Sequence, residues 1–506
     1  MSYFLGIDVG TSGTKALIMD ESGRVLCTAT EGYAVDMPQN GWAEQHPGIW
    51  WEAAIGAVRG VLKNAEYVKG LKAVGLTGQM HGLAMLDKKG DVIRPALLWC
   101  DQRTGDQCRQ ITEAVGEKRL IELTANPALT GFTSPKILWV RENEPENYAK
   151  CASIMLPKDY IRYKLTGDNA GDMSDASGTG LLDVPRRCWS DEVLDKLNID
   201  KGLLGKLYES CEVTGQISEA AARETGLPAG LPVVAGAGDN AAAAIGTGVA
   251  RDGRAFVTIG SSGVVFAHTS VMKLDPAGRA HAFCAAVPGE WHVMGVSLAA
   301  GMSLQWLRNQ ALSNLCEQAA KEGRDVYDIM SGLAARSPIG SNRLIFLPYL
   351  NGERTPHKDP DCRGVFFGLS ASHTQNDLIR AVMEGVSFAG KDSLDIIREM
   401  GIGVKDITAC GGGGGSAFWR GMLADVFGIP VAAAQSQEGP ALGAAILAAV
   451  GAGVFKSVPA ACDALITTNA PAMPEQSSTA GYAKYHVLFK SLYASLKDDF
   501  KTLSAL

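Results

Sequence analysis

The sequence predicts an α/β protein of two lobes, each a mixed β-sheet flanked by helices, with a cleft between them. The chain has 506 residues, more than the roughly 250 to 300 at which a single hydrophobic core stops growing. Hydrophobic residues make up 46% and charged residues 20% of the chain, which is enough apolar material for large cores. A strand–loop–strand pattern that occurs twice supports the same division.

The first copy of this pattern opens the chain. We expect strands at residues 3–9 and 14–19, joined by a Gly-Thr-Ser-Gly turn, and a third strand from Arg24 after a second turn. Apolar spacing then predicts a helix over residues 49–62, and a strand over residues 73–76 follows it, which resembles a crossover connection. A meander joined to a crossover predicts a mixed sheet.

The second copy begins about 250 residues later. A predicted strand over residues 254–260 runs into Ser261-Ser262-Gly263, and another strand starts at Val264. We interpret the two copies as related lobes whose facing loops hold opposite sides of one ligand. The predicted lobes are residues 1–246 and residues 247–506.

The second half also predicts a strand, a glycine run and two helices. The strand over residues 406–410 leads into five consecutive glycines, after which Ser416 is placed to cap a helix that reaches Val426. A backbone without side chains lets a flat ligand approach closely. Residues 376–400 predict a long amphipathic helix that Gly401 ends, and its expected role is packing.

The turn after the first strand is a candidate phosphate and metal site. Asp8 stands at the end of that strand, and Thr11, Ser12 and Lys15 lie in or just after the turn. Backbone N–H groups and hydroxyls in such a turn can hold phosphate oxygens, while a carboxylate can hold the Mg²⁺ that bridges them. An ordinary hairpin turn with an incidental Asp explains an isolated match equally well. The similar Gly260–Gly263 turn favours phosphate.

Asp239 is the candidate general base. In the segment Pro232–Asn240 a predicted strand delivers it to the sheet edge, where an alanine-rich helix starts, so the helix amino terminus should keep it ionised. Asn240 follows directly and is a candidate substrate contact. From this segment alone, a simple helix cap explains Asp239 equally well.

A third polar segment, Gln79-Met80-His81-Gly82, follows the strand over residues 73–76. Donors and acceptors beside a thioether suit a polyhydroxylated ligand, although a lone histidine is more often structural. Trp99 and the polar residues after it could add contacts, and an exposed loop would have the same sequence.

Two glycine patterns point to nucleotide motifs that the context excludes. Gly236–Ala241 fits a loose dinucleotide-binding pattern, but helix and loop follow where a strand-end acid should stand. Gly385–Lys391 has the spacing of a P-loop, but Asp392 replaces the Ser or Thr, and the stretch lies in a helical pattern.

Composition limits the partners. A net charge of -7 with scattered Lys and Arg argues against nucleic acid and against an anionic membrane surface. The 11 cysteines show no CxxC pair, which indicates free thiols in a reducing compartment. No basic leader and no apolar span of membrane length stand out, so we expect a cytoplasmic protein.

With these pieces in order, the chain resembles the FGGY carbohydrate kinases, a family with the actin-like (ribonuclease H-like) fold. Gly131–Asn143 matches the first family pattern, and Gly364–Leu369, leading to Asp377 and Glu384, matches the second. Several further segments fit, and the resemblance covers nearly the whole length: Gln79–Gly82, Leu156–Tyr160, Ser174–Thr179 and Pro348–Pro356. The likeness is strongest to the ketopentose kinases of the family.

The resemblance implies ATP and Mg²⁺ as cofactors and D-xylulose as substrate, phosphorylated on its C5 hydroxyl. Asp239 would be the base, Asp8 would serve the metal, and Met80 and His81 would touch the sugar. Two further groups would lie near the nucleotide phosphates and the adenosine respectively: Gly260, Ser261, Gly301 and Gln305, and Gly412, Gly413 and Ser416.

Two alternatives remain at this point. A pocket distinguishes epimers by a few hydrogen bonds, so another ketopentose or a pentitol is an open alternative. An actin-like, nucleotide-driven clamp without sugar phosphorylation is a rival from another class, because fold alone does not decide function. A small sugar and ATP are the expected partners, with a homodimer as one option.

Overall fold

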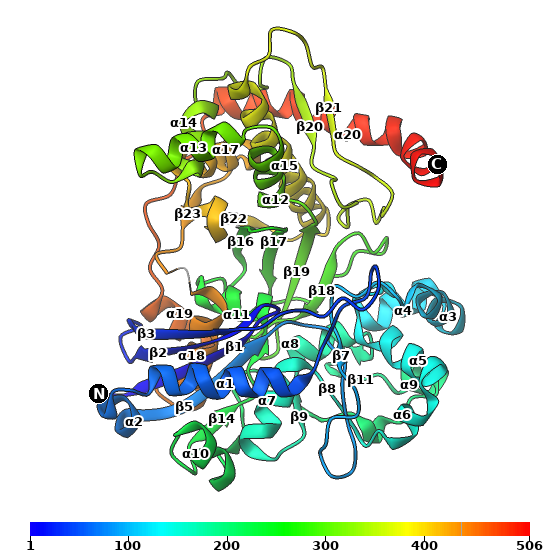
Figure 1. Ribbon diagram of the computed structural model, residues 1–506, viewed down its shortest axis with the longest axis vertical. Coiled ribbons are helices and arrows are strands. Elements are labelled where there is room, and N and C mark those ends of the chain that lie inside the picture. Colours follow the sequence, from blue (N-terminus) through cyan, green and yellow to red (C-terminus); the bar gives the residue numbers. More distant parts are fainter. Residues whose placement is uncertain (437) are drawn as a thin grey trace.

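The computed structural model describes residues 1–436 and 438–506, which form two large β-sheets with helices and small two-stranded sheets around them (Figure 1). The sheet of the N-terminal lobe has the strand order β13-β14-β5-β1-β2-β3, and the short strand β15 pairs with β5. The bounds of its strands are β1 Tyr3–Val9, β2 Gly13–Asp20, β3 Val25–Gly32, β5 Leu71–Gly78, β13 Val213–Gln216, β14 Pro232–Val234 and β15 Ala237–Gly238.

The second sheet repeats this arrangement. Its strand order is β18-β19-β17-β16-β22-β23. Strand β16 pairs antiparallel with β17 and parallel with β22, as β1 pairs antiparallel with β2 and parallel with β5. The predicted meander, the mixed sheets and the repeat are therefore confirmed. The bounds are β16 Gly253–Ile259, β17 Gly263–Thr269, β18 His281–Cys284, β19 Trp291–Ser297, β22 Val404–Cys410 and β23 Val431–Ala433.

Helices α1 (Pro47–Val61) and α18 (Gly439–Gly451) both pack on the N-terminal sheet. Helix α1 contacts β2 and β3, and α18 contacts β1 and β5 as well as helix α11 (Asp239–Gly246). Glycine permits the close approach of α18, because a Cβ on Gly6 would stand 2.0 Å from the carbonyl oxygen of Ala441. The chain thus returns to the first lobe after it has built the second sheet, and the lobe boundary at residue 246 stays a prediction.

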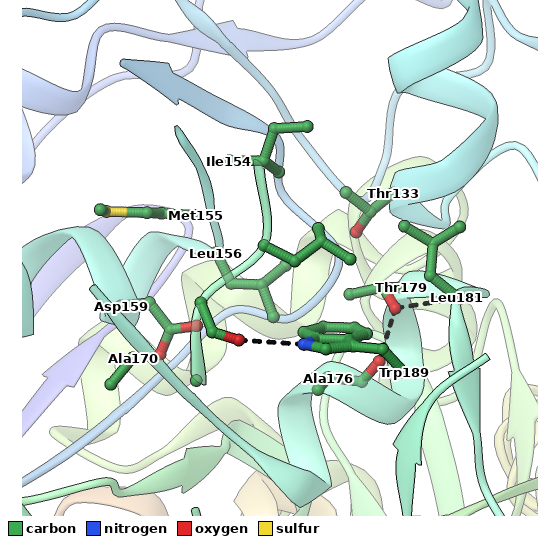
Figure 2. Close-up of a pocket in the computed structure, with 13 residues that line it drawn as sticks. Thr133, Ile154, Met155, Leu156, Asp159, Ala170, Ala176, Thr179, Leu181 and Trp189 are labelled. Atoms are coloured by element: carbon green, nitrogen blue, oxygen red, sulfur yellow. Dashed lines mark hydrogen bonds between the residues drawn. The ribbon is translucent and has the colours of Figure 1, made fainter. Parts of the chain in front are cut away.

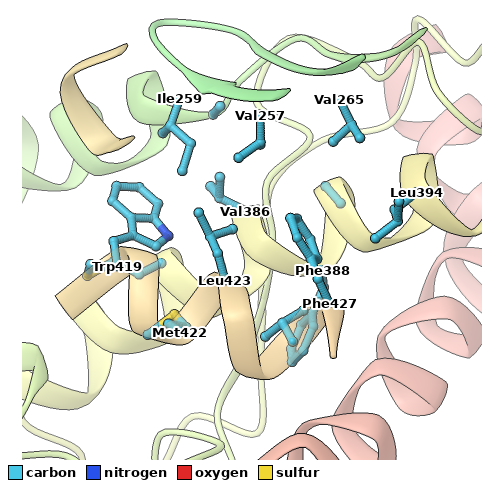
Figure 3. Packing of buried hydrophobic residues seen from close by; sticks show 14 of the residues in the cluster. Val257, Ile259, Val265, Val386, Phe388, Leu394, Trp419, Met422, Leu423 and Phe427 are labelled. Atoms are coloured by element: carbon cyan, nitrogen blue, oxygen red, sulfur yellow. The ribbon is translucent and has the colours of Figure 1, made fainter. Parts of the chain in front are cut away.

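The core of the C-terminal lobe lies between its sheet and helices α15 (Gln375–Glu399) and α17 (Ala417–Phe427) (Figure 3). Val257 and Ile259 of the sheet lie over Val386 of α15 and over Trp419 and Leu423 of α17. The predicted packing role of α15 is confirmed.

Local signals account for where the main helices begin and end. The Nδ1 atom of His46 accepts a hydrogen bond from Gly48 N at 3.1 Å, and Pro47 follows it, so α1 begins two residues before the predicted start. Thr374 and Asp377 form a capping box at the start of α15. Gly401, with φ +78°, follows the end of α15 as expected.

The remaining elements build the periphery of the lobes. In the first half they are β4 Glu44–Gln45, α2 Ala65–Gly70, β6 Ala84–Leu86, β7 Ala96–Leu97, α3 Gly105–Val115, α4 Glu117–Thr124, α5 Thr133–Asn143, α6 Pro145–Lys150, β8 Ser153–Met155, α7 Pro157–Thr166, β9 Ala170–Asp172, α8 Met173–Ala176, β10 Leu182–Asp183, β11 Cys188–Trp189, α9 Asp191–Leu197, β12 Lys206–Tyr208 and α10 Glu219–Thr225. In the second half they are α12 Gly301–Gln310, α13 Ser313–Glu322, α14 Val326–Ala334, β20 Ile345–Leu347, β21 Val365–Phe367, α16 Gly411–Gly415, α19 Val458–Leu465 and α20 Gln476–Ala505.

Two predictions about the whole chain can be compared with these elements. Among the described residues, no helix is both long enough and apolar enough to cross a bilayer. All 11 cysteines are free thiols, as expected.

Three histidines are buried in a group of aromatic rings where the lobes meet. His292 stacks on Phe266 with 4.3 Å between ring centroids, and His281 stacks on Phe283 at 5.9 Å. Burial lowers the pKa of His81 and of His292 to about 3, and it lowers the pKa of His281 well below its ordinary value. These imidazoles are therefore neutral in the folded protein.

We expect the neutral state of His292 to make stability depend on pH. Its folded-state pKa lies below the unfolded value of about 6.5, so the unfolded chain takes up the proton first and stability is lost as the pH falls below about 6.5. The loss is about 1.4 kcal/mol for each pH unit. Replacing His292 with Phe should remove this share. Urea unfolding of the variant and the wild type between pH 7.5 and 5.5 measures the difference.

The matched control for this experiment is His46→Asn. His46 is exposed and caps α1, and Asn keeps a cap acceptor while it removes an imidazole. The His46→Asn curve shows what an exposed imidazole contributes, so its comparison with His292→Phe isolates the effect of burying the imidazole. An unchanged pH dependence in His292→Phe would contradict the prediction.

Candidate functional site

The candidate site lies at the edge of the N-terminal sheet where three strands end together. Asp8 of β1 is in register with Thr77 of β5, and Ala237 of β15 is in register with the same Thr77. Both pairings are parallel, so all three strands present their carboxyl ends at one edge. Asp8, the segment after Gly78 and Asp239 are thereby brought together.

Asp239 is the first residue of helix α11, and Gly238 occupies the cap position. The Oδ1 atom of Asp239 accepts hydrogen bonds from Asn240 N at 2.7 Å and from Asn240 Nδ2 at 3.0 Å. Asp239 is therefore not the cap of this helix. Burial raises its pKa to about 6, which the hydrogen bonds from Asn240 oppose. The carboxylate remains ionised at pH 7, and a pKa near the operating pH suits a general base.

Asp8 has the chemistry of a cation ligand. Burial and the neighbouring charge of Asp239 raise its pKa to about 7, while Lys15 acts in the opposite direction. Two carboxylates that repel each other at the edge of a cleft favour a positive ion between or beside them. Their oxygen atoms are the ligands that Mg²⁺ prefers, so this pair fits the implied metal.

The turn after β1 is held by both backbone and side-chain hydrogen bonds. Gly10 N donates to the Gly13 carbonyl at 3.0 Å, and the exposed Ser12 uses its carbonyl to accept from Tyr33 N at 3.1 Å. The hydroxyl of Thr11 accepts from Trp99 Nε1 at 2.9 Å and donates to Gln79 Oε1 at 3.2 Å. Thr11 thus connects the turn to the Gln79 segment.

Lys15 forms an ion pair with Glu438 at 2.7 Å. Strand β2 carries the lysine, and Glu438 stands just before helix α18, which crosses from the second half of the chain. The predicted phosphate contact of Lys15 would exchange this carboxylate for phosphate oxygens.

The second lobe contains a cavity of about 370 Å³, within the size range of ligand pockets. All seven predicted nucleotide residues of this lobe line it: Gly260, Ser261, Gly301, Gln305, Gly412, Gly413 and Ser416. The glycine run forms the short helix α16 rather than a loop, and Ser416 then caps α17 through a bond from Trp419 N at 3.3 Å. Asp325, Tyr327 and Asp328 also line the cavity and were missed by sequence reasoning.

A second cavity, of about 260 Å³, is lined by residues of both lobes. Asp239 and Asn240 of the first lobe line it together with Thr258, Cys410 and Gly411 of the second. Gly411 directly precedes the Gly412 and Gly413 of the larger cavity. A ligand that extends from the larger cavity toward Gly411 would therefore point its end at Asp239.

Gln79, Met80 and His81 are all buried. Gln79 Nε2 donates to the Gly10 carbonyl at 3.3 Å, so its amide helps to hold the first turn. A Cβ on Gly238 would stand 3.0 Å from the sulfur atom of Met80, which places Met80 against the residue before Asp239. His81 has a left-handed backbone with φ +68°, and its Nδ1 lies 2.7 Å from the Gly178 carbonyl oxygen.

Lys136 fixes the backbone of His81. It is fully buried, and its Nζ donates to the carbonyl oxygens of His81 at 2.9 Å and Gly131 at 2.6 Å. Thr133 donates to the same His81 oxygen at 3.1 Å. Burial lowers the pKa of Lys136 to about 7. The family pattern at Gly131–Asn143 contains this lysine, but its spacing alone gives no sign of where the ammonium group points.

A buried charged network stands behind Asp239. Asp159, Asp172 and Asp175 bring their carboxylates within 4.8 Å of one another, but Lys158 Nζ already lies 2.6 Å from Asp159 and 2.7 Å from Asp172. The lysine supplies the positive charge that a metal ion would bring. Ser174, bound to Asp172 at 2.5 Å, accepts from Gly238 N at 3.1 Å, so the network reaches the residue before Asp239.

A small internal cavity in the N-terminal lobe is not a substrate site (Figure 2). Its volume of about 20 Å³ holds about one water molecule. Trp189 closes one side, where its Nε1 donates to the Gly205 carbonyl at 2.9 Å. The cleft between the lobes therefore remains the candidate site.

Known proteins share the sequence and the fold of this chain. Residues 3–246 match the N-terminal domain, and residues 255–452 the C-terminal domain, of the FGGY family of carbohydrate kinases. The chain is 39% identical to a xylulose kinase of Escherichia coli, over 97% of this chain and 99% of the relative. It is 36% identical to a xylulose kinase of Bacillus subtilis, over 98% of each chain. The crystal structure of xylulose kinase from Rhodospirillum rubrum has 29% identity, a TM-score of 0.90, and coverage of 99% of this chain and 100% of that one.

Proposed function

Because the chain belongs to the FGGY family of carbohydrate kinases, we propose that it transfers the γ-phosphoryl group of ATP to D-xylulose. The products are D-xylulose 5-phosphate and ADP. The observation that carries this proposal is the position of Asp239, which lines a cavity between the lobes beside the glycine run of the proposed nucleotide cavity. The relatives named xylulose kinase support the choice of sugar.

In the proposed reaction, Asp239 accepts the proton of the C5 hydroxyl while that oxygen bonds to the γ-phosphorus. The bond from the γ-phosphorus to the bridging oxygen of ADP breaks, and its electrons stay on ADP. Phosphoryl transfer needs mostly positioning and charge stabilisation from a protein. Asn240 positions the carboxylate of Asp239 through its two hydrogen bonds.

Asp8, with Asp239 nearby, would hold Mg²⁺ at the edge of the sheet. When bound, the ion neutralises negative charge on the phosphates of the nucleotide. Gly260, Ser261, Gly301 and Gln305 would then lie near the phosphates, and Gly412, Gly413 and Ser416 near the adenosine.

An ADP-release assay across ketopentoses, pentitols and glycerol tests the function. We expect strong dependence on added sugar, with D-xylulose giving the highest kcat/KM. If another sugar gives the highest kcat/KM, that sugar is the substrate, and the protein is still a carbohydrate kinase. ADP release that is independent of every sugar would instead favour the nucleotide-driven clamp and overturn the proposal.

We expect His81→Ala to raise the KM for D-xylulose and to leave the KM for ATP nearly unchanged. The His81 segment adjoins Asp239 through Met80, whereas the nucleotide residues lie in the other lobe. Loss of a hydrogen bond to substrate typically costs about 1 kcal/mol or more, which is about fivefold or more in kcat/KM. Steady-state kinetics with each substrate varied in turn measures both constants.

His81→Asn is the matched control, because Asn tolerates a positive φ better than most residues. If both variants lose their fold rather than their sugar affinity, the histidine is structural. A comparable rise in the KM for ATP would also contradict the prediction.

A further inference from the structure

Arg354 lies in the long connection between β20 and β21 of the C-terminal lobe, yet its guanidinium reaches the His81 segment of the N-terminal lobe. A Cβ built on Gly131 would stand 3.8 Å from Arg354 Nη2. Lys136 Nζ donates hydrogen bonds to the carbonyl oxygens of both Gly131 and His81, so Gly131 lies beside the His81 segment. The positive charge of Arg354 also contributes to the lowered pKa values of His81 and His281.

The backbone that carries Arg354 is held rigidly against β19. The carboxylate of Glu353 accepts hydrogen bonds from Ser297 Oγ at 2.7 Å, Leu298 N at 3.0 Å and Arg354 N at 2.8 Å. Thr355 N donates to the Val296 carbonyl at 3.0 Å, and Thr355 Oγ1 accepts from Val296 N at 3.0 Å. Because this backbone is fixed, the Arg354 side chain starts from a defined position before any ligand binds.

The guanidinium itself has no protein partner among the described residues. Burial lowers its pKa, and Glu353 is the only charge that opposes this effect. The oxygens of Glu353 are already occupied by three other donors. Arg354 is half-buried, so its five N–H donors are partly withdrawn from water, and without a protein acceptor they favour a ligand that supplies acceptor oxygens.

The location of Arg354 indicates which oxygens these are. His81 feels the charge of Arg354, and Arg354 Nη2 lies near Gly131. The base side of the segment is marked instead by Met80, which packs against Gly238, the residue before Asp239. Arg354 therefore stands at the end of the sugar site away from the base. A ketose bound with its C5 hydroxyl at Asp239 turns its C1 hydroxyl and C2 carbonyl toward that end.

We propose that Arg354 is a substrate-binding residue that donates hydrogen bonds to the C2 carbonyl and C1 hydroxyl of the ketose. The inference rests on the proposed function and adds a specificity-determining contact from the second lobe. The planar guanidinium donates two hydrogen bonds in one plane, which matches the in-plane lone pairs of a carbonyl oxygen better than the tetrahedral oxygen of the hydroxyl that a pentitol carries there. Arg354 thus selects ketoses over pentitols, and sugar binding brings both lobes onto one ligand.

The test compares Arg354→Met and Arg354→Lys with the wild type on D-xylulose, xylitol and D-arabinitol. A hydrogen bond to a charged donor makes a difference of roughly 10- to 100-fold, so kcat/KM for D-xylulose should fall by that factor in Arg354→Met. The kcat/KM for the pentitols should fall much less, so the ratio of kcat/KM for D-xylulose to kcat/KM for a pentitol should fall about 10-fold or more. Arg354→Lys should fall between the two, and the KM for ATP should change little.

Arg363→Met is the matched control from the same connection. Arg363 is exposed, and its Nη1 donates only to the carbonyls of Pro360 and Cys362, each at 2.8 Å. Arg363→Met should keep the wild-type ratio of kcat/KM for D-xylulose to kcat/KM for the pentitols. The wild-type assay decides the proposed function independently, because it needs no variant.

Two results would overturn the proposal: an unchanged ratio of ketose to pentitol kcat/KM in Arg354→Met, or a ratio that falls equally in Arg363→Met. If Arg354→Met does not fold, the proposal is tested with Arg354→Lys, whose affinity for D-xylulose is measured by calorimetry without nucleotide. Wild-type affinity of Arg354→Lys for D-xylulose would then refute the contact.

Discussion

Asp239→Asn should reduce the turnover of D-xylulose by about 100- to 10,000-fold, the usual cost of losing a general base. Asn has nearly the shape of Asp but cannot accept the proton of the C5 hydroxyl. A loose transition state needs the proton removed late, which favours the lower end of this range. Binding of D-xylulose and of ATP should persist, because neither cavity changes shape.

Stability separates this expectation from a structural role for Asp239. Gly238, not Asp239, caps α11, and burial raises the pKa of Asp239 to about 6, so the folded protein gains little from its charge. The thermal midpoint of Asp239→Asn should equal or exceed that of the wild type. Turnover from an ADP-release assay, the midpoint from calorimetry and sugar affinity from titration test the three points.

Asn240→Ala is the matched variant for this experiment. It removes the side-chain hydrogen bond to Asp239 Oδ1 and keeps the one from the backbone N–H, so it should lose less turnover than Asp239→Asn. Near-normal turnover in Asp239→Asn would exclude Asp239 as the base.

The sequence predicted those parts of the structure that depend on local pattern. The strands around Asp8 and the repeat at Gly260 follow from alternation and turn residues. The carboxyl ends of β1 and β15 place Asp8 and Asp239 at one edge because parallel strands end together. The resemblance to a family supplied the glycines and Gln305, which the structure gathers around one cavity.

Long-range features could not be predicted in this way. The partner of Lys15 is Glu438, 423 residues away, and no spacing rule connects them. Lys136 and Lys158 are fully buried, although lysine is among the residues least often buried. Each is held by partners that only the folded chain assembles: two carbonyl oxygens for Lys136 and a group of aspartates for Lys158.

The second large expected effect is that of replacing Asp8, which lies beside Asp239 at the edge of the sheet. Asp8 and Asp239 repel each other, and a protein retains such a pair at a cost in stability when function requires it. Asp8→Asn should therefore leave the thermal midpoint unchanged or raise it. It should also weaken Mg²⁺-dependent turnover, because an amide oxygen holds a divalent ion less strongly than a carboxylate.

Titration of Mg²⁺ at fixed ATP measures this effect. We expect the Mg²⁺ concentration for half-maximal turnover to rise about 10- to 100-fold in Asp8→Asn, the range seen when groups that support a metal are replaced. ATP affinity without Mg²⁺ should change little, and so should the affinity for D-xylulose, since Gln79, Met80 and His81 keep their places. An equal loss of sugar affinity, or a lowered thermal midpoint, would show that Asp8 supports the fold of the edge rather than the metal.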